Sequence, residues 1–279
     1  MFEALLQMLD HPKIDIFIHM DAKNKCYDPA ETLKLVKFSR VIHVPRIRVS
    51  WGGYSQVEAA LTLIKAATQE GHYGHYHMLS GADLPIKKSD EIINFFERHQ
   101  GVEFVHFSNS TFLHDKWVSY YYPLQEYIGR EKGNIFIRKL NSLCLKVQKV
   151  IGVHRNKGVN FQKGSDWFSI TDKFARYLLS QQEWIKSVLH NTFMSTEIYL
   201  HTVLINSPFR DNLYCEEIGG SILSSIMRLI DWPRGSGAHP YTFRLSDLDE
   251  IQASPAMFAR KFHPSVDADI IERIRELYS

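Results

Sequence analysis

Two aspartates stand directly after short apolar segments, where a ligand could reach them. Asp21 follows residues 14–19, and Asp83 follows residues 76–79. In an α/β protein, ligands bind where loops converge at the ends of strands. A carboxylate in such a loop can accept hydrogen bonds from the ribose or the base of a nucleotide. Both residues are therefore candidates for a nucleotide site, and the alternative that they only form turns stays open.

A pair of cations near the C-terminus could hold phosphate groups. Arg260 and Lys261 lie between Phe258 and Phe262. Buried rings on either side would fix one or both cations in position, as a pyrophosphate clamp requires. The alternative is a solvated basic turn.

Aromatic side chains provide platforms on which sugar rings could stack. Trp117 and the tyrosines at 120–122 lie in one aromatic-rich segment, and Trp232 lies in the turn-forming sequence DWPRG. Tryptophan is also common in protein cores, so a structural role is the alternative for Trp232.

The candidate metal ligands are poorly placed. The two D-x-D triplets, at 247–249 and 267–269, are expected in the first turns of late helices, where carboxylates favour the helix dipole. The histidines of HYGHYH, residues 72–77, share no single face of a helix or strand and lack a cysteine or carboxylate to complete a ligand set. Glu197 and His201 are four residues apart, but the HExxH pattern is absent. We therefore expect no metal cofactor.

Strands and helices that alternate along the chain should position these residues. Strands are predicted at residues 14–19, 41–44, 76–79, 103–107 and 168–170. Helices are predicted over residues 2–9, 247–253 and 266–277 and from four N-terminal residues, namely Ser55 with an S-x-x-E capping box, Ser89, Thr171 and Ser195. This order predicts an α/β fold with a mainly parallel sheet covered by helices. Residues 109–160 are less regular and are expected to leave the sheet and to carry specificity.

Length and composition limit the classes that remain. With 279 residues, 44% of them hydrophobic and 23% charged, the chain can form one packed domain over residues 1–279. A net charge of +2 argues against a nucleic-acid partner. Three cysteines without a CxxC pattern indicate neither a disulfide framework nor a zinc site, and favour a reducing compartment. The chain has no apolar run long enough for a membrane helix and no signal peptide, so a soluble, cytoplasmic protein is expected.

Several blocks of sequence carry a family resemblance. WGGYSQVEAALTLIKAA, YHMLSGADLPIK, KGSDWFSIT, STEIYLHTVLINSPF, LIDWPRGSGAHP and SPAMFARKF follow one another in that order. Together with IHMDAK and INFF they resemble the core-2/I-branching β-1,6-N-acetylglucosaminyltransferase family, which includes peptide O-xylosyltransferases, in a bacterial form. The blocks cover nearly the whole chain.

The resemblance implies a GT-A-like fold, a UDP-sugar donor, a carbohydrate acceptor (lipid-linked glycans among the candidates), inversion at the anomeric carbon and no metal. It implies that Glu197 is the general base, that Lys261 holds the donor diphosphate with Arg260 beside it, and that Asp21 and Asp83 lie in the donor pocket. It places Trp232 against the acceptor, and Trp117 is predicted to join it there. If Glu197 is not the base, Asp166 and Asp231 are the next candidates.

The chain departs from the family pattern in three ways. The family's first strand, of the type x-A-Y-L-I-x-A-H, has no counterpart before residue 2. The base lies in Ser195-Thr196-Glu197, without the aspartate that precedes it in the animal enzymes. A second diphosphate-binding arginine has no clear match, and the candidates are Arg234, His239 and Arg244. The animal enzymes also carry a membrane anchor and disulfides, and their absence here favours a cytoplasmic relative.

Two other functions remain possible on the sequence. One is a metal-dependent nucleotide-sugar enzyme, for which a D-x-D directly after an early strand would be needed. The other is an inactive carbohydrate-binding protein that uses Trp117, residues 120–122 and Trp232 as sugar platforms. For an active enzyme, N-acetylglucosamine and xylose are the expected sugars.

Overall fold

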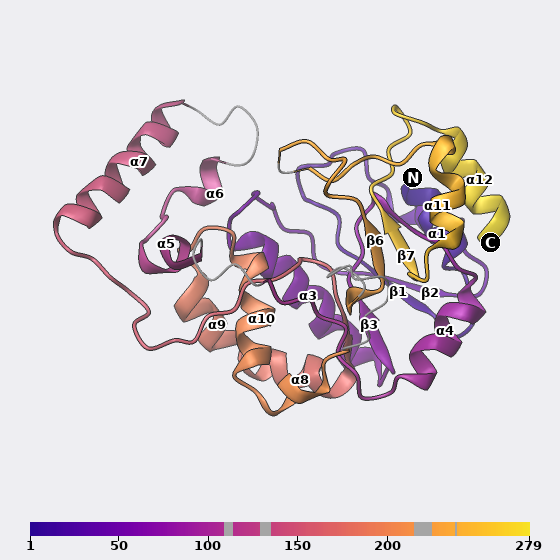
Figure 1. Ribbon diagram of the computed structural model, residues 1–279, viewed down its shortest axis with the longest axis horizontal. Coiled ribbons are helices and arrows are strands. Elements are labelled where there is room, and N and C mark those ends of the chain that lie inside the picture. Colours follow the sequence, from indigo (N-terminus) through magenta and orange to yellow (C-terminus); the bar gives the residue numbers. More distant parts are fainter. Residues whose placement is uncertain (109–113, 129–134, 215–224, 238) are drawn as a thin grey trace.

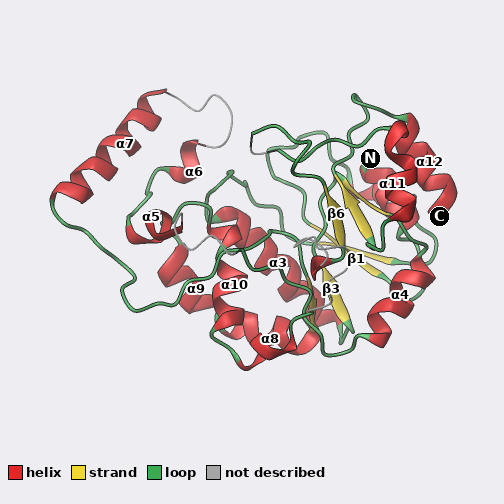
Figure 2. Cartoon of the chain, in the orientation of Figure 1, coloured by secondary structure: helices red, strands yellow, loops and turns green. Residues whose placement is uncertain are grey.

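The computed structural model describes residues 1–108, 114–128, 135–214, 225–237 and 239–279. Short strands gather in one half of the molecule, and helices cover them and fill the other half (Figure 2). The described elements, in chain order, are α1 (Phe2–Met8), β1 (Asp15–Ile18), α2 (Pro29–Leu33), β2 (Arg40–His43), α3 (Ser55–Glu70), β3 (His75–His77), β4 (Asp83–Pro85), α4 (Ser89–Arg98), α5 (His114–Ser119), α6 (Gln125–Ile128), α7 (Ile135–Val150), β5 (Ser169–Thr171), α8 (Asp172–Ser180), α9 (Gln182–Leu189), the 3₁₀ turn η1 (Ser195–Glu197), α10 (Tyr199–Ile205), the 3₁₀ turn η2 (Pro208–Asn212), β6 (Arg228–Ile230), the 3₁₀ turn η4 (Leu245–Asp247), α11 (Leu248–Ala253), β7 (Phe258–Arg260) and α12 (Asp269–Tyr278).

The strands form three small sheets with both parallel and antiparallel pairs. β1 pairs with β2 in parallel, and β3 pairs with β5 in antiparallel fashion. The third sheet has the order β4-β7-β6, in which β7 is antiparallel to β4 and parallel to β6. The α/β class is confirmed, and small sheets flanked by helices are consistent with a GT-A-like fold.

Apolar side chains on the inner faces of these elements form the core. In α3, the buried Val57, Leu61 and Ile64 recur at helical spacing and pack against the cluster formed by α8, α9 and α10. A second cluster of buried side chains covers the β4-β7-β6 sheet. It contains Leu84 of β4, Phe243, and residues of the helices α1 and α12. The sheet and the α3 cluster therefore form a fixed base for the loops at their edges.

Residues 114–128 and 135–150 contain no strand and include the helices α5, α6 and α7. α7 lies at the outer edge of the molecule, on the side away from the chain termini and from α11 and α12 (Figure 1).

Three predicted local features are wrong in detail. α3 begins at Ser55, but the Ser55 hydroxyl donates to Glu126 Oε2 at 2.6 Å and does not cap the helix with Glu58. α4 begins at Ser89, whose hydroxyl donates to the carbonyl of Met8. In both cases the serine hydroxyl donates a hydrogen bond to a residue far away in the sequence, and so it does not cap its own helix as the local pattern predicted. Residues 103–107 make isolated bridges and no continuous strand.

Two other predicted helix starts have different outcomes. The Thr171 hydroxyl accepts a hydrogen bond from the amide of Phe174, so the predicted cap of α8 is confirmed. Ser195 opens the 3₁₀ turn η1, and the α-helix begins only at Tyr199. Glu197 therefore lies at the end of a 3₁₀ turn, before the helix in which it was expected.

Candidate active site

Two segments of the chain hold the turn that contains Glu197, and residues 163–164 form the first of them. The carbonyl of Glu197 accepts a hydrogen bond from the amide of Gly164 at 2.8 Å, and its Oε2 lies 2.9 Å from the ammonium of Lys163. The Lys163 and Glu197 side chains are 21% and 20% exposed, so the ion pair reaches the surface. A Cβ at Gly164 would lie 1.9 Å from the carbonyl oxygen of His106. Only glycine therefore allows this segment to lie so close to the His106 carbonyl and the His201 ring.

The loop before α3 fixes η1 from the other side. The amide of Met194 donates to the carbonyl of Gly52 at 2.9 Å, and the Ser195 hydroxyl donates to the carbonyl of Gly53. Gly52 has a φ of +72°, and a Cβ there would lie 3.0 Å from the Phe193 ring. The WGGYS segment is thus the backbone support on which the Glu197 turn rests.

Asp166 connects Glu197 with the next cluster of charges. Burial, and to a smaller extent the charge of Glu197, raise the pKa of Asp166 to about 6. The Thr196 hydroxyl and the charges of Arg260 and Lys163 act in the opposite direction. Its buried Oδ1 has no hydrogen-bond partner in the described part of the chain. Asp166 is therefore a second carboxylate beside the candidate base, with a proton that is lost near pH 6.

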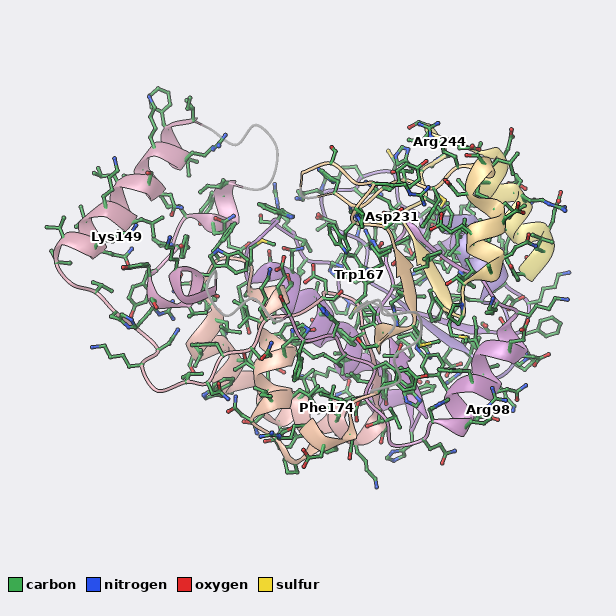
Figure 3. The ribbon with its side chains drawn as sticks, viewed as in Figure 1. Arg98, Lys149, Trp167, Phe174, Asp231 and Arg244 are labelled. Carbon is green, nitrogen blue, oxygen red and sulfur yellow. The ribbon has the colours of Figure 1, made fainter. Side chains whose placement is uncertain are left out.

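Asp83 and Arg260 form a buried ion pair. They lie directly opposite each other in the register of β4 and β7, with Asp83 Oδ1 3.0 Å from Arg260 Nη1. Asp83 Oδ2 accepts hydrogen bonds from the amide of Ser80 and from the indole N–H of Trp167. The Arg260 guanidinium lies 3.6 Å from the centre of the Trp167 ring. Trp167 lies near the middle of the molecule in the view of Figure 3.

The two members of this pair affect each other's ionisation. Burial raises the pKa of Asp83, while the charge of Arg260 lowers it. Burial lowers the pKa of Arg260, and the charges of Asp83 and Asp166 raise it. Both oxygens of Asp83 already accept hydrogen bonds from the protein. Its predicted role as a ligand of the donor stays a prediction.

Lys261 follows Arg260 at the end of β7, in a backbone fixed by its neighbours. Its carbonyl accepts a hydrogen bond from the amide of Phe243 at 2.9 Å. Phe258 and Phe262 are 1% and 0% exposed, so the prediction that buried rings flank the two cations is confirmed. Within the described ranges, no hydrogen bond or ion pair engages the Lys261 ammonium.

Asp21 lies beyond the end of β1, in a loop that its own side chain stabilises. Its Oδ1 accepts hydrogen bonds from the amides of Lys23 and Val49, and its Oδ2 lies 3.3 Å from the Lys23 ammonium. Burial raises the pKa of Asp21, but these hydrogen bonds and the Lys23 charge outweigh it and hold the pKa below its usual value. Asp21 is thus ionised and one-third exposed at a strand end. Its part in donor binding stays a prediction.

Side chains of several separate segments line an aromatic pocket of about 440 Å³, and Glu197 is not among them. Its lining includes Trp51, Trp117, Tyr122 and Phe193, with polar groups that include Gln125. The rings of Trp51, Trp117 and Tyr122 each contact the Phe193 ring at centroid distances of 5.6–5.9 Å. Trp117 was predicted from the sequence as a binding residue, whereas Trp51 and Phe193, which come from distant segments, were not.

Lys163 joins this pocket to Glu197. Its ammonium lies 5.0 Å from the centre of the Trp117 ring, and at the same time 2.9 Å from Glu197 Oε2. Lys163 and Trp167 were missed as individual residues, although both lie in the KGSDWFSIT block that carries the resemblance. Sequence spacing held no signal for the ion pair, because residues 163 and 197 meet only in the folded chain.

The candidates between β6 and α11 for acceptor and diphosphate binding lie in and after the turn that follows β6. Trp232 is 42% exposed, in the turn after β6. The guanidinium of Arg234 pairs with three carboxylates, those of Asp231, Asp247 and Glu250, so this candidate for the diphosphate is already engaged. His239 lies in the same turn region, and Arg244 reaches the carbonyl of Val266.

The D-x-D triplets serve the protein's own structure. Asp247 accepts hydrogen bonds from Arg234 and from the amide of Arg244, and Asp267 accepts from the amides of Leu245 and Ile270. Within the described ranges, no group of three or more His, Cys, Asp or Glu side chains is arranged to hold a metal ion.

The histidines near the site also have structural surroundings. His201, four residues after Glu197, is 1% exposed, and burial lowers its pKa to about 3, so it is neutral. In the HYGHYH segment, His72 lies 2.8 Å from Asp172, His75 contacts the carbonyl of Val102, and His77 bonds the Ser169 hydroxyl. Each ring therefore has a different protein partner.

A search for membrane spans in the described ranges finds no helix with the length and apolar character to cross a bilayer.

Comparison with known proteins gives consistent matches. The model of a family described as "Core-2/I-Branching enzyme" matches residues 1–254. "Xylosyltransferase 1" of Homo sapiens is 25% identical over 98% of this chain and 28% of its own length. "Xylosyltransferase sqv-6" of Caenorhabditis briggsae is 24% identical over 97% of this chain and 34% of its own length, and "Xylosyltransferase 2" of Rattus norvegicus is 24% identical over 97% and 31%. The chain spans about a third of the length of these relatives.

Proposed function

The chain belongs to the Core-2/I-Branching enzyme family of glycosyltransferases, and we propose that it transfers a sugar from a UDP-sugar to a glycan hydroxyl, with inversion at the anomeric carbon and without a bound metal. The relatives named above are xylosyltransferases, which favours xylose as the transferred sugar. N-acetylglucosamine is the alternative.

One observation carries the proposal. Glu197, a partly exposed carboxylate, pairs with Lys163, and the Lys163 ammonium lies over the ring of Trp117, which lines an aromatic pocket. Aromatic faces bind the apolar faces of sugar rings, and a carboxylate can accept the proton of a sugar hydroxyl. The pocket thus fits the acceptor, and Glu197 fits the base.

In the proposed reaction, the acceptor hydroxyl attacks the anomeric carbon of the donor sugar, and the bond from that carbon to the diphosphate breaks. Glu197 takes the hydroxyl proton, and the departing UDP keeps the electron pair of the broken bond. No covalent enzyme intermediate is needed, because one displacement gives inversion.

The leaving diphosphate needs positive charge as its bond breaks. Lys261 is the candidate, since no side-chain partner of its ammonium is found in the described part of the chain. Arg260 precedes it, but its guanidinium is committed to Asp83 and Trp167. In this proposal Arg260 shapes the wall of the donor site, and Lys261 supplies the charge.

The proposed activity is tested by UDP release. The protein is incubated with UDP-xylose or UDP-N-acetylglucosamine and a mixture of peptide, oligosaccharide and lipid-linked glycan acceptors. Acceptor-dependent UDP release supports a transferase. Glycan binding without UDP release from either donor, and without UDP binding, would instead favour the inactive carbohydrate-binding protein.

Lys261→Ala is expected to weaken UDP binding. Loss of one charged partner of the diphosphate costs about 2–3 kcal/mol, or roughly 30- to 160-fold in Kd. Isothermal calorimetry with UDP measures the change. Lys65→Ala, at an exposed lysine in the middle of α3, is the control and should bind UDP like the wild type. Equal affinities for wild type and Lys261→Ala would remove Lys261 from the site.

Turnover is expected to persist in EDTA. The proposal gives the charge on the leaving group to Lys261, and the acidic triplets are occupied by protein amides and Arg234. Initial rates with and without the chelator provide the measurement. A rate abolished by EDTA and restored by manganese would overturn the metal-free proposal and favour a metal-dependent nucleotide-sugar enzyme.

A further inference from the structure

α7 exposes an unusual amount of apolar surface. Phe136, Leu140, Leu143, Val147 and Val150 are 76%, 51%, 55%, 48% and 86% exposed. Successive members of this set are separated by four, three, four and three residues, so they lie along one face of the helix. Ile151, just after the helix, adds a side chain that is 68% exposed. We call these six residues the α7 apolar face. Water contacts all six along one side of a sixteen-residue helix.

The opposite side of α7 is attached to the protein. Asn141 is buried, and Gln148 exchanges two hydrogen bonds with the backbone of Tyr121. Asn141, Ser142 and Leu145 line the aromatic pocket. The helix is therefore oriented by its inner side, and the α7 apolar face points away from the body of the protein. Figure 1 shows α7 at the outer edge of the molecule.

The charges of α7 are all positive. Residues 135–150 contain Arg138, Lys139, Lys146 and Lys149 and no Asp or Glu. At 100° per residue, Lys139 and Lys146 border the α7 apolar face on one side. An apolar face with lysines along its border is typical of a helix that lies in the plane of a membrane surface.

We propose that the α7 apolar face binds the surface of a membrane that contains anionic lipids. The apolar side chains enter the boundary between headgroups and acyl chains, and the lysines contact lipid phosphates. Charge complementarity favours this partner over a second copy of the chain. A symmetric dimer places the same patch on both subunits, so the basic residues of two α7 helices would face each other.

This orientation has a consequence for the acceptor, which rests on the proposed function. The aromatic pocket lies on the inner side of the helix whose outer side meets the membrane. A glycan carried on a lipid would then reach the aromatic pocket from the membrane surface. Membrane binding itself is independent of any activity, so its test is separate from the test of transfer.

Vesicle flotation with the purified full chain tests the proposal. Vesicles are made of phosphatidylcholine alone or of phosphatidylcholine with one-third phosphatidylglycerol. Binding is expected to the anionic vesicles and to weaken with added salt. Leu143→Ser/Val147→Ser should reduce the partition coefficient about tenfold or more through lost apolar burial. Lys139→Gln/Lys146→Gln should reduce it roughly 25-fold, since each lysine near an anionic surface contributes about fivefold.

A matched pair of exposed apolar residues gives the control. Leu33 and Phe38 are 52% and 63% exposed in and after α2, and Leu33→Ser/Phe38→Ser should float like the wild type. Thermal melting shows whether each variant is folded. If Leu143→Ser/Val147→Ser does not fold, Lys139→Gln/Lys146→Gln still tests membrane binding. Absence of vesicle binding, or equal loss in the control, would overturn the proposal. So would a dimer in sedimentation velocity that Leu143→Ser/Val147→Ser converts to a monomer.

Discussion

Glu197→Gln is expected to reduce turnover about 10²- to 10⁴-fold, the usual contribution of a positioned general base. Glutamine keeps the shape of the side chain and can still accept a hydrogen bond from Lys163, but it cannot take the proton of the acceptor hydroxyl. UDP affinity should barely change, because the proposed diphosphate contact is made by Lys261. Initial rates of UDP release and calorimetry with UDP measure the two quantities.

Glu183→Gln is the matched control, since Glu183 is an exposed carboxylate in the first turn of α9. If both residues only stabilise the start of a helix, both variants should lose a little melting temperature and keep their turnover. A Glu197→Gln variant that retains most of its activity at neutral pH would make Glu197 structural. The base would then be sought at Asp166, whose proton is lost near pH 6 in the same cluster.

Asp83→Ala is expected to lower the free energy of unfolding by about 3–5 kcal/mol, as is usual when one partner of a buried ion pair is removed. Asp83 and Arg260 are 2% and 9% exposed. The change leaves the Arg260 charge, the Trp167 indole N–H and the Ser80 amide without the carboxylate. Urea denaturation followed by circular dichroism measures the loss.

Glu97→Ala provides the control for an ion pair of similar length. Lys13 and Glu97 lie 3.1 Å apart, but their side chains are 62% and 51% exposed. Such a surface pair contributes about 0–1 kcal/mol, so Glu97→Ala should unfold close to the wild-type midpoint. A similar, small loss in both variants would show that the Asp83–Arg260 pair does not stabilise the buried strands.

The sequence was informative where local pattern decides structure. Helical spacing of Val57, Leu61 and Ile64 correctly predicted α3, and the Thr171 cap correctly predicted the start of α8. The apolar character of Phe258 and Phe262 correctly predicted that both rings are buried.

Local pattern failed where a distant partner competes. The Ser55 hydroxyl donates a hydrogen bond to Glu126, 71 residues away, and the predicted capping box with Glu58 does not form. The same limit applies to the candidate site, where the Lys163–Glu197 pair and the contact of Trp51 with Phe193 join separate segments. Spacing could identify Glu197 and Trp117 as candidates, but it could not place Lys163 between them, because that position depends on the folded arrangement of three segments.

The pairing of β4 with β7 also bears on the order in which the molecule is completed. Asp83 pairs with Arg260, which lies 177 residues later in the chain. During synthesis, β4 therefore emerges long before β7, and the Asp83 carboxylate lacks its charged partner until the last part of the chain arrives. Contacts with such large sequence separation form slowly, because the intervening chain loses entropy before the contact is gained. The Asp83–Arg260 pair is thus formed late, after the segments around α3 can already have folded.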